Sequence, residues 1–177
     1  MNYLIGIDLG TSGTKTVLFN ENGEAIASAT QEYPLYQPQN GWLSRIRRIG
    51  GMQCLDAQAV IVKAGWLWEA IAGIGISGQM HGLVMLDQEE MFYAKVFCGV
   101  TGVPGRMLGD YGARGQDRLI QITANPALTG FTASKILWVR KHEPELYARC
   151  RHILLPKDYI RYQLTGVFAT DVSDAPA

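Results

Sequence analysis

The strongest chemical signal in the chain is a strand that ends in a carboxylate and runs into a turn of glycines and hydroxyl residues. Residues 5–15 read IGIDLGTSGTK, with Asp8 at the strand end. The N–H groups and hydroxyls of such a turn can hydrogen-bond phosphate oxygens, and Asp8 can hold a magnesium ion through water. The candidate phosphate ligands are Thr11, Ser12, Gly13 and Lys15. The alternative interpretation is an ordinary β-hairpin, with Lys15 as a solvated strand residue.

A second signal is a bend with polar side chains between two apolar runs. Residues 75–82 read GISGQMHG, and the glycines that flank the polar residues permit a sharp change of chain direction. Polar side chains in such a bend can face a cleft, and an imidazole can both donate hydrogen bonds to hydroxyl groups and accept them. Taken alone, His81 is more typical of a structural histidine and Met80 of a core residue.

The composition is that of one globular domain. The 177 residues are 47% hydrophobic, which suffices to bury a single core. The 16 basic and 16 acidic residues balance, so charge gives no case for nucleic acid or an anionic membrane as the partner. Residues 1–8 read as a strand rather than a signal peptide, and no apolar run approaches membrane-spanning length. The 3 widely spaced cysteines fit reduced thiols in a cytoplasmic protein.

The hydrophobic periodicity predicts an α/β domain. Short β-type runs at 4–7, 16–19 and 24–30 predict an antiparallel start to a sheet. Further strands are expected at 71–77, 83–87 and 153–155, and helices from 132 onward, near Pro144 and over 157–164, ended by Gly166. The apolar residues of these later segments, among them Leu137, Trp138 and Tyr159, are expected in the core rather than in a binding site.

Two stretches have no period that fits a helix or a strand. Residues 43–54 read LSRIRRIGGMQC, and residues 91–115 are rich in glycine and valine. Surface loops are one interpretation of both stretches. A long structureless loop inside a domain, however, counts against its own assignment.

Three strings carry a resemblance to a known family. The string DLGTSGTK at residues 8–15 resembles the first phosphate motif of the actin, Hsp70 and sugar kinase superfamily. The bend at 75–82 resembles the segment with which xylulokinases contact their sugar. Residues 122–174 are similar to the same enzymes in the strings GFTASK, LLPKDY and TDVSDA, with Ser134 where the family commonly has proline. The chain therefore resembles the FGGY carbohydrate kinases, most of all the N-terminal part of the xylulokinases.

The resemblance implies a fold, a reaction and a set of roles. Residues 1–177 would form an incomplete actin-like (ribonuclease H-like) ATPase domain, the N-terminal FGGY domain. The reaction would transfer the γ-phosphate of ATP, with Mg²⁺, to D-xylulose, and Asp8 and its turn would face the phosphates and the metal. Gln79, Met80 and His81 would contact the sugar, with His81 positioning it rather than abstracting a proton. A small sugar is the expected partner, and a homo-oligomer is compatible with the sequence.

The family places its general base and its nucleotide-binding C-terminal domain beyond residue 177, so the chain is expected to be inactive alone. The alternatives are a catalytically dead pseudogene product, a sugar-binding half-domain, or a kinase of another FGGY substrate class such as ribulose, gluconate or glycerol.

The resemblance is interrupted at the two irregular stretches, and single-base repairs restore it. With freely chosen codons, one G added after the codon for Trp42 turns residues 43–54 into the family-like string AEQDPADWWNAV. One A added at the codon for Met91 gives NVLRKSILWCD in the same way. We hypothesise compensated frameshifts. They would remove a Trp-Cys-Asp segment, which resembles the Trp-Asn-Asp type motif whose carboxylate helps the family to hold its sugar. They would also leave core positions unfilled, so stability is expected to be marginal.

Overall fold

The computed structural model describes most of the chain. The described residues are 2–10, 12–32, 42–45, 68–90, 96–100, 117–126, 128 and 130–174, with backbone alone at 42–45, 68 and 96–100. Thr11 and most of the two irregular stretches therefore lie outside the described residues.

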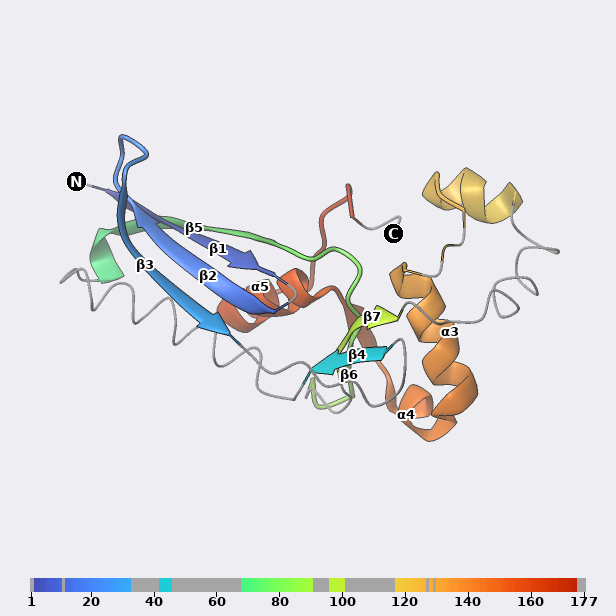
Figure 1. Ribbon diagram of the computed structural model, residues 1–177. Helices are drawn as coiled ribbons and strands as arrows, with labels where there is room; N and C mark the ends of the chain where they lie inside the picture. Colours follow the sequence, from blue (N-terminus) through green and yellow to red (C-terminus); the bar gives the residue numbers. More distant parts are fainter. Residues whose placement is uncertain are drawn as a thin grey trace.

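A four-stranded mixed sheet forms the first layer (Figure 1). Its strands lie in the order β3-β2-β1-β5. The strands are β1 (Tyr3–Leu9), β2 (Gly13–Phe19), β3 (Ala25–Glu32) and β5 (Ile71–Gly78). The β1–β2 and β2–β3 pairs are antiparallel, whereas β5 runs parallel to β1. The predicted antiparallel start of the sheet is confirmed.

Alternation along β1 decides which face of the sheet is buried. Tyr3, Ile5 and Ile7 are buried and form one core cluster with Leu18 of β2. The residues between them, and Asp8, which follows Ile7, point to the other face, because successive side chains of a strand alternate. The polar end of β1 is thus presented on a rigid strand whose opposite face is anchored in the core.

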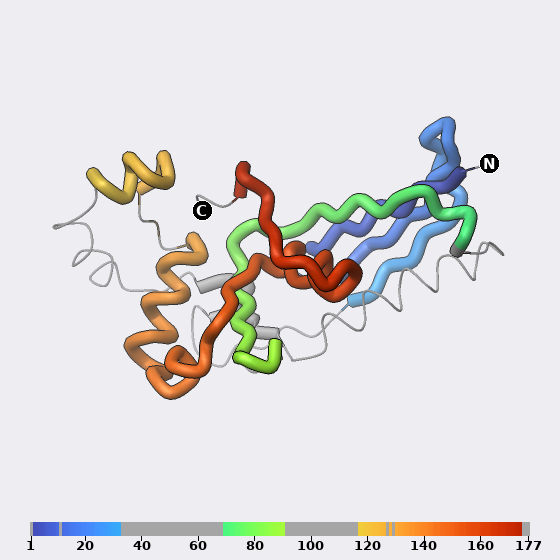
Figure 2. The backbone as a smooth tube through the Cα atoms, turned by 180° about the vertical axis from the view of Figure 1, so that it is seen from behind, coloured from blue at the N-terminus to red at the C-terminus, as the bar shows by residue number. Residues whose placement is uncertain are grey.

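The second layer begins with helix α5, which packs against β5 (Figure 2). It spans Pro156–Thr165 and ends at Gly166, which has a positive φ of 68°. Strands β6 (Val84–Leu86) and β8 (His152–Leu154) pair antiparallel beside it. Residues of β1, β6, β8 and α5 share a core cluster, which contains Leu9, Val84, Leu86, Leu154, Ile160 and Tyr162.

Helices α3 (Thr132–His142) and α4 (Pro144–Arg149) lie at the far end from β3, with a further helical segment at 117–123 (Figure 1). A core cluster packs α3 against β6 and its flanking residue; it contains Leu83, Met85 and Val139. Trp138 packs against this cluster. Tyr159 packs against the cluster of the sheet and α5. The expectation that Trp138 and Tyr159 serve the core is confirmed. A short 3-10 helix, Trp68–Ala70, precedes β5.

Where the irregular stretches are described, they form one pair of strands. Strand β4 (Trp42–Arg45) pairs antiparallel with β7 (Val96–Val100). The interpretation of both stretches as surface loops is wrong for these residues, because the backbones of the two segments satisfy each other's hydrogen bonds. Among the described residues, no helix is both long and apolar enough to cross a membrane.

Candidate functional site

The two chemical motifs meet at the carboxyl ends of β1 and β5. In the parallel register Asp8 lies beside Ser77, and Leu9 lies beside Gly78. The main-chain N–H of Gln79 donates to the carbonyl of Leu9 at 3.0 Å. The glycine-rich turn after β1 and the bend after β5 are therefore neighbours in space, although some 70 residues separate them in the sequence.

The end of β1 and the start of β2 present charged and hydroxyl groups on the exposed face of the sheet at this edge. Asp8 lies opposite Lys15 across the β1–β2 pair, and both side chains are exposed, as are Ser12 and Ser77. Directly opposed side chains of unlike charge lie within reach of each other across such a pair. Ser77 was missed in the sequence, because only the parallel register places it beside the carboxylate.

Gly13 has a packing role in the turn. A Cβ atom added there would lie 2.8 Å from the carbonyl oxygen of Gln31 on β3. The residue therefore has to be glycine for β2 and β3 to pair this closely. Thr11, the remaining candidate phosphate ligand, lies outside the described residues.

The residues of the β1 turn fit a magnesium ion only through water. Among the residues that the structure describes, no three His, Cys, Asp or Glu side chains lie close enough together to hold a metal ion. Magnesium usually keeps several waters and takes one or two carboxylates together with substrate phosphates. The exposed carboxylate of Asp8 suits that mode of binding and does not suit a site built from protein ligands alone.

The bend after β5 presents one exposed apolar side chain and two buried polar atoms. Met80 is 46% exposed, so the alternative interpretation of Met80 as a core residue is wrong. Gln79 Nε2 and His81 Nδ1 are buried, and no hydrogen-bond partner for either atom exists among the described residues. Buried polar atoms are normally paired, so this pair of atoms is suited to a hydroxyl-bearing ligand.

His81 is held from two sides by the segment that begins α3. Its ring stacks on Phe131, with the centroids 4.6 Å apart and the planes 25° apart. Its main-chain carbonyl accepts a hydrogen bond from the ammonium of Lys135. Burial lowers the pKa of His81 below its ordinary value, the positive charge of Lys135 lowers it further, and Asp174 opposes them. The imidazole is therefore neutral at pH 7, with one nitrogen that donates and one that accepts.

The string GFTASK thus contributes to the site in a way that sequence reasoning missed. Lys135 is only 1% exposed. It lies on the same face of α3 as Thr132 and Val139, three residues before it and four after it, and both are buried. That spacing was a readable signal, but a lysine on an apolar face is more often solvated than buried.

The strings LLPKDY and TDVSDA contact each other. Lys157 forms an ion pair with Asp174, which raises the pKa of the lysine. The hydroxyl of Thr170 donates to the buried carboxylate of Asp158 at 2.7 Å. These contacts fix residues 170–174 against the start of α5.

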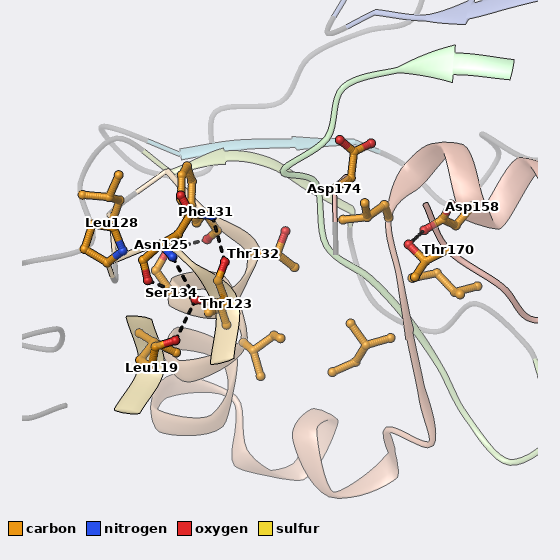
Figure 3. Close-up of a pocket in the computed structure, with 16 residues that line it drawn as sticks. Leu119, Thr123, Asn125, Leu128, Phe131, Thr132, Ser134, Asp158, Thr170 and Asp174 are labelled. Carbon is orange, nitrogen blue, oxygen red and sulfur yellow. Dashed lines mark hydrogen bonds between the residues drawn. The ribbon is translucent and has the colours of Figure 1, made fainter. Parts of the chain in front are cut away.

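A cavity of about 340 Å³ lies between the helical segment at 117–123, α3 and the start of α5 (Figure 3). Leu119, Leu128 and Phe131 line one side of it, and Asp174 faces it from another. Phe131 belongs both to this cavity and to the ring stack on His81. The cavity therefore lies next to the bend after β5.

The lowered pKa of His81 predicts a pH-dependent stability. The unfolded chain binds a proton at a higher pH than the folded chain, so stability falls as the pH drops from about 6.5 towards the folded pKa. Replacing His81 by glutamine should remove this part of the loss. The measurement is urea unfolding of both chains at about pH 7.5 and about pH 5.5. Exposed His142 on α3, replaced in the same way, is the control. An unchanged pH dependence in His81→Gln contradicts the prediction.

The fold and the facing motifs define an α/β domain of the actin-like ATPase class, as the sequence predicted. Within that class, the chain belongs to the FGGY family of carbohydrate kinases: the N-terminal domain of that family matches residues 3–177.

Individual relatives agree with this assignment. The xylulose kinase of Bacillus subtilis (strain 168) is 43% identical over 180 residues, covering 99% of this chain and 35% of the relative. A xyloylose kinase from Brucella ovis has a TM-score of 0.89 at 34% identity, over 99% of this chain and 36% of that one. A gluconate kinase from Lactobacillus acidophilus has a TM-score of 0.79 at 27% identity, over 99% of this chain and 35% of that one. The chain spans about a third of the length of these relatives.

Proposed function

We propose that this chain supplies the sugar-binding and phosphate-binding part of an ATP-dependent D-xylulose kinase. The observation that carries the proposal is the meeting of the two motifs, with the N–H of Gln79 bonded to the carbonyl of Leu9 at 3.0 Å. A sugar held at the bend after β5 then lies next to a phosphate held at the turn after β1. Transfer between two bound groups requires this proximity.

Each residue of the site has a role in this proposal. The amide of Gln79 donates to a sugar hydroxyl, and the neutral ring of His81 positions a second one. Met80 covers an apolar face of the sugar. Asp8, Thr11, Ser12, Gly13 and Lys15 form the phosphate and metal side. Mg²⁺ bound with ATP supplies charge neutralisation for the phosphates, and Asp8 orients it through water.

D-Xylulose is preferred over other sugars because the relatives at 43%, 38% and 37% identity are all described as xylulose kinases. The gluconate kinase is 27% identical, no more than a solved xylulose kinase from the same organism. The GQMH string of the bend favours the same substrate. We place the reaction in the cytoplasm, where ATP is available and cysteine thiols stay reduced.

The phosphoryl transfer itself needs more than these residues. The chain spans only about a third of its relatives, so we propose that the general base and the domain that closes on the nucleotide come from outside residues 1–177. On its own the chain then binds the sugar without turning it over, and a sugar-binding half-domain is the second candidate function. ATP-dependent phosphorylation of D-xylulose by the purified chain would exclude that second candidate.

Sugar binding tests the proposal directly. We expect the chain to bind D-xylulose more tightly than D-gluconate or glycerol, measured by titration calorimetry. Met80→Ala should weaken D-xylulose binding about 3- to 10-fold, because an exposed apolar contact is lost without damage to the core. Ile26→Ala on β3 is the matched control, since Ile26 is 44% exposed at the other end of the sheet. Equal affinity for all three ligands, or none for D-xylulose, contradicts the proposal.

We further propose that residues 43–54 and 91–115 carry reading-frame errors. The proposal rests on the two single-base repairs, each of which restores a family-like string. Resequencing the DNA that encodes residues 42–117 should recover one missing base at the start of each stretch and a compensating change that returns the downstream residues to their present frame. Confirmation of the present reading would overturn the proposal and leave the chain with its irregular stretches as they stand.

A further inference from the structure

Lys135 is a buried charge that the proposed reaction does not use. The side chain is 1% exposed and lies on the inner face of α3, beside Val139. Removing an ammonium group from water is costly unless its donors are paired. Its Nζ donates to the carbonyl of His81 and, at 2.9 Å, to the carbonyl of Gly130. Both acceptors are main-chain groups of loops, so the lysine ties two loops to one helix.

The first of these loops is the bend that carries the sugar ligands. His81 stands between Met80, which is exposed, and Gly82, which is buried against Pro156. The second loop carries Phe131, whose ring stacks on the imidazole of His81. One ammonium therefore fixes the backbone of His81 and the loop that holds the ring of His81. A substitution at Lys135 is therefore expected to move both the main chain of His81 and the loop that carries Phe131.

We propose that Lys135 is a positioning residue of the sugar site: it holds the carbonyl of His81 so that the imidazole stays stacked on Phe131 and faces the ligand. The sugar in this proposal rests on the proposed function, whereas the hydrogen bonds of Lys135 and the stacking of His81 on Phe131 do not depend on it. The choice of residue has a physical reason. An ammonium on a long stem offers three donors that can diverge towards two carbonyls, whereas an apolar side chain has no donor for either carbonyl.

The test compares Lys135→Met with Lys141→Met. Methionine keeps the length and apolar stem of the lysine but has no donors. Lys141 lies on the same helix and is exposed, so its replacement controls for the loss of one charge from α3. The readout is the proton NMR spectrum of the His81 ring, which reports its stacking on Phe131 and its pKa. D-Xylulose affinity is measured on the same samples.

We expect Lys135→Met to lose the ring-current shift of His81 and to raise its pKa towards the ordinary value, because a positive charge has left its surroundings. D-Xylulose binding should weaken at least about tenfold. Lys141→Met should leave the ring-current shift of His81, its pKa and the D-xylulose affinity unchanged. A folded Lys135→Met chain with the His81 shift and pKa of the parent overturns the proposal. If the parent binds no D-xylulose, the proposed function fails, while the His81 readout still decides the role of Lys135.

A second measurement needs no variant and covers the case in which Lys135→Met does not fold. A scalar coupling across the hydrogen bond between Lys135 Nζ and the carbonyl carbon of His81 is expected in the isotope-labelled parent chain. A visible ammonium signal of Lys135 without that coupling overturns the proposal.

Discussion

Replacement of Gly82 by alanine is expected to lower the free energy of unfolding by about 1–3 kcal/mol and to displace the bend after β5. A Cβ atom at this position would lie 2.3 Å from Cγ and 2.8 Å from Cδ of Pro156. Pro156 is buried at the first turn of α5, and its ring has little freedom to move away. The clash can be relieved only if the bend and α5 move apart.

Gly130→Ala is the matched control for Gly82→Ala. A Cβ atom at Gly130 would meet no atom within 4 Å among the described residues. Neither glycine has a φ in the positive range that disfavours other residues, so the two substitutions differ in packing alone. Urea unfolding followed by circular dichroism measures both. Equal midpoints for the two variants would show that α5 and the bend are not packed as described.

The sequence predicted the elements that have their own local signal. The β-type run at residues 4–7, the proline at the start of α4 and the glycine after α5 each define an element or its end, and all are found where expected. Local periodicity reports which face of an element is buried, and that information is complete within a few residues. The fold class followed from the order of these elements.

Strand pairings and the buried charge of Lys135 were harder to predict from the sequence. Strands β4 and β7 are short, and their ladder joins segments some 50 residues apart, so neither carries a pattern of its own. Ser77 joins the site only through the parallel register of β1 and β5. Lys135 has the spacing of a core residue but the chemistry of a surface residue, and only its carbonyl partners resolve the conflict. These features depend on contacts between distant residues, which a single sequence does not show.

The largest catalytic effect is expected at Asp8. Its carboxylate stands at the end of β1, opposite Lys15 and beside Ser77, next to the turn that we propose faces the phosphates. In the proposed function it orients the magnesium ion through water, and asparagine keeps its shape without its charge. We expect Asp8→Asn to reduce kcat about 100-fold or more, since charge placed for a phosphoryl transition state is lost.

Because the chain spans a third of its relatives, the assay combines it with the remaining two-thirds of the Bacillus subtilis xylulose kinase. ATP-dependent phosphorylation of D-xylulose is then measured as a function of Mg²⁺ concentration. Glu21→Gln is the control, since Glu21 is an exposed carboxylate in the turn at the opposite end of β2. An Asp8→Asn complex whose kcat and Mg²⁺ dependence match those of Glu21→Gln would remove Asp8 from the metal site. A 100-fold loss confined to Asp8, with an altered Mg²⁺ dependence, would instead support a metal ion held at the end of β1, next to the bend that we propose holds the sugar.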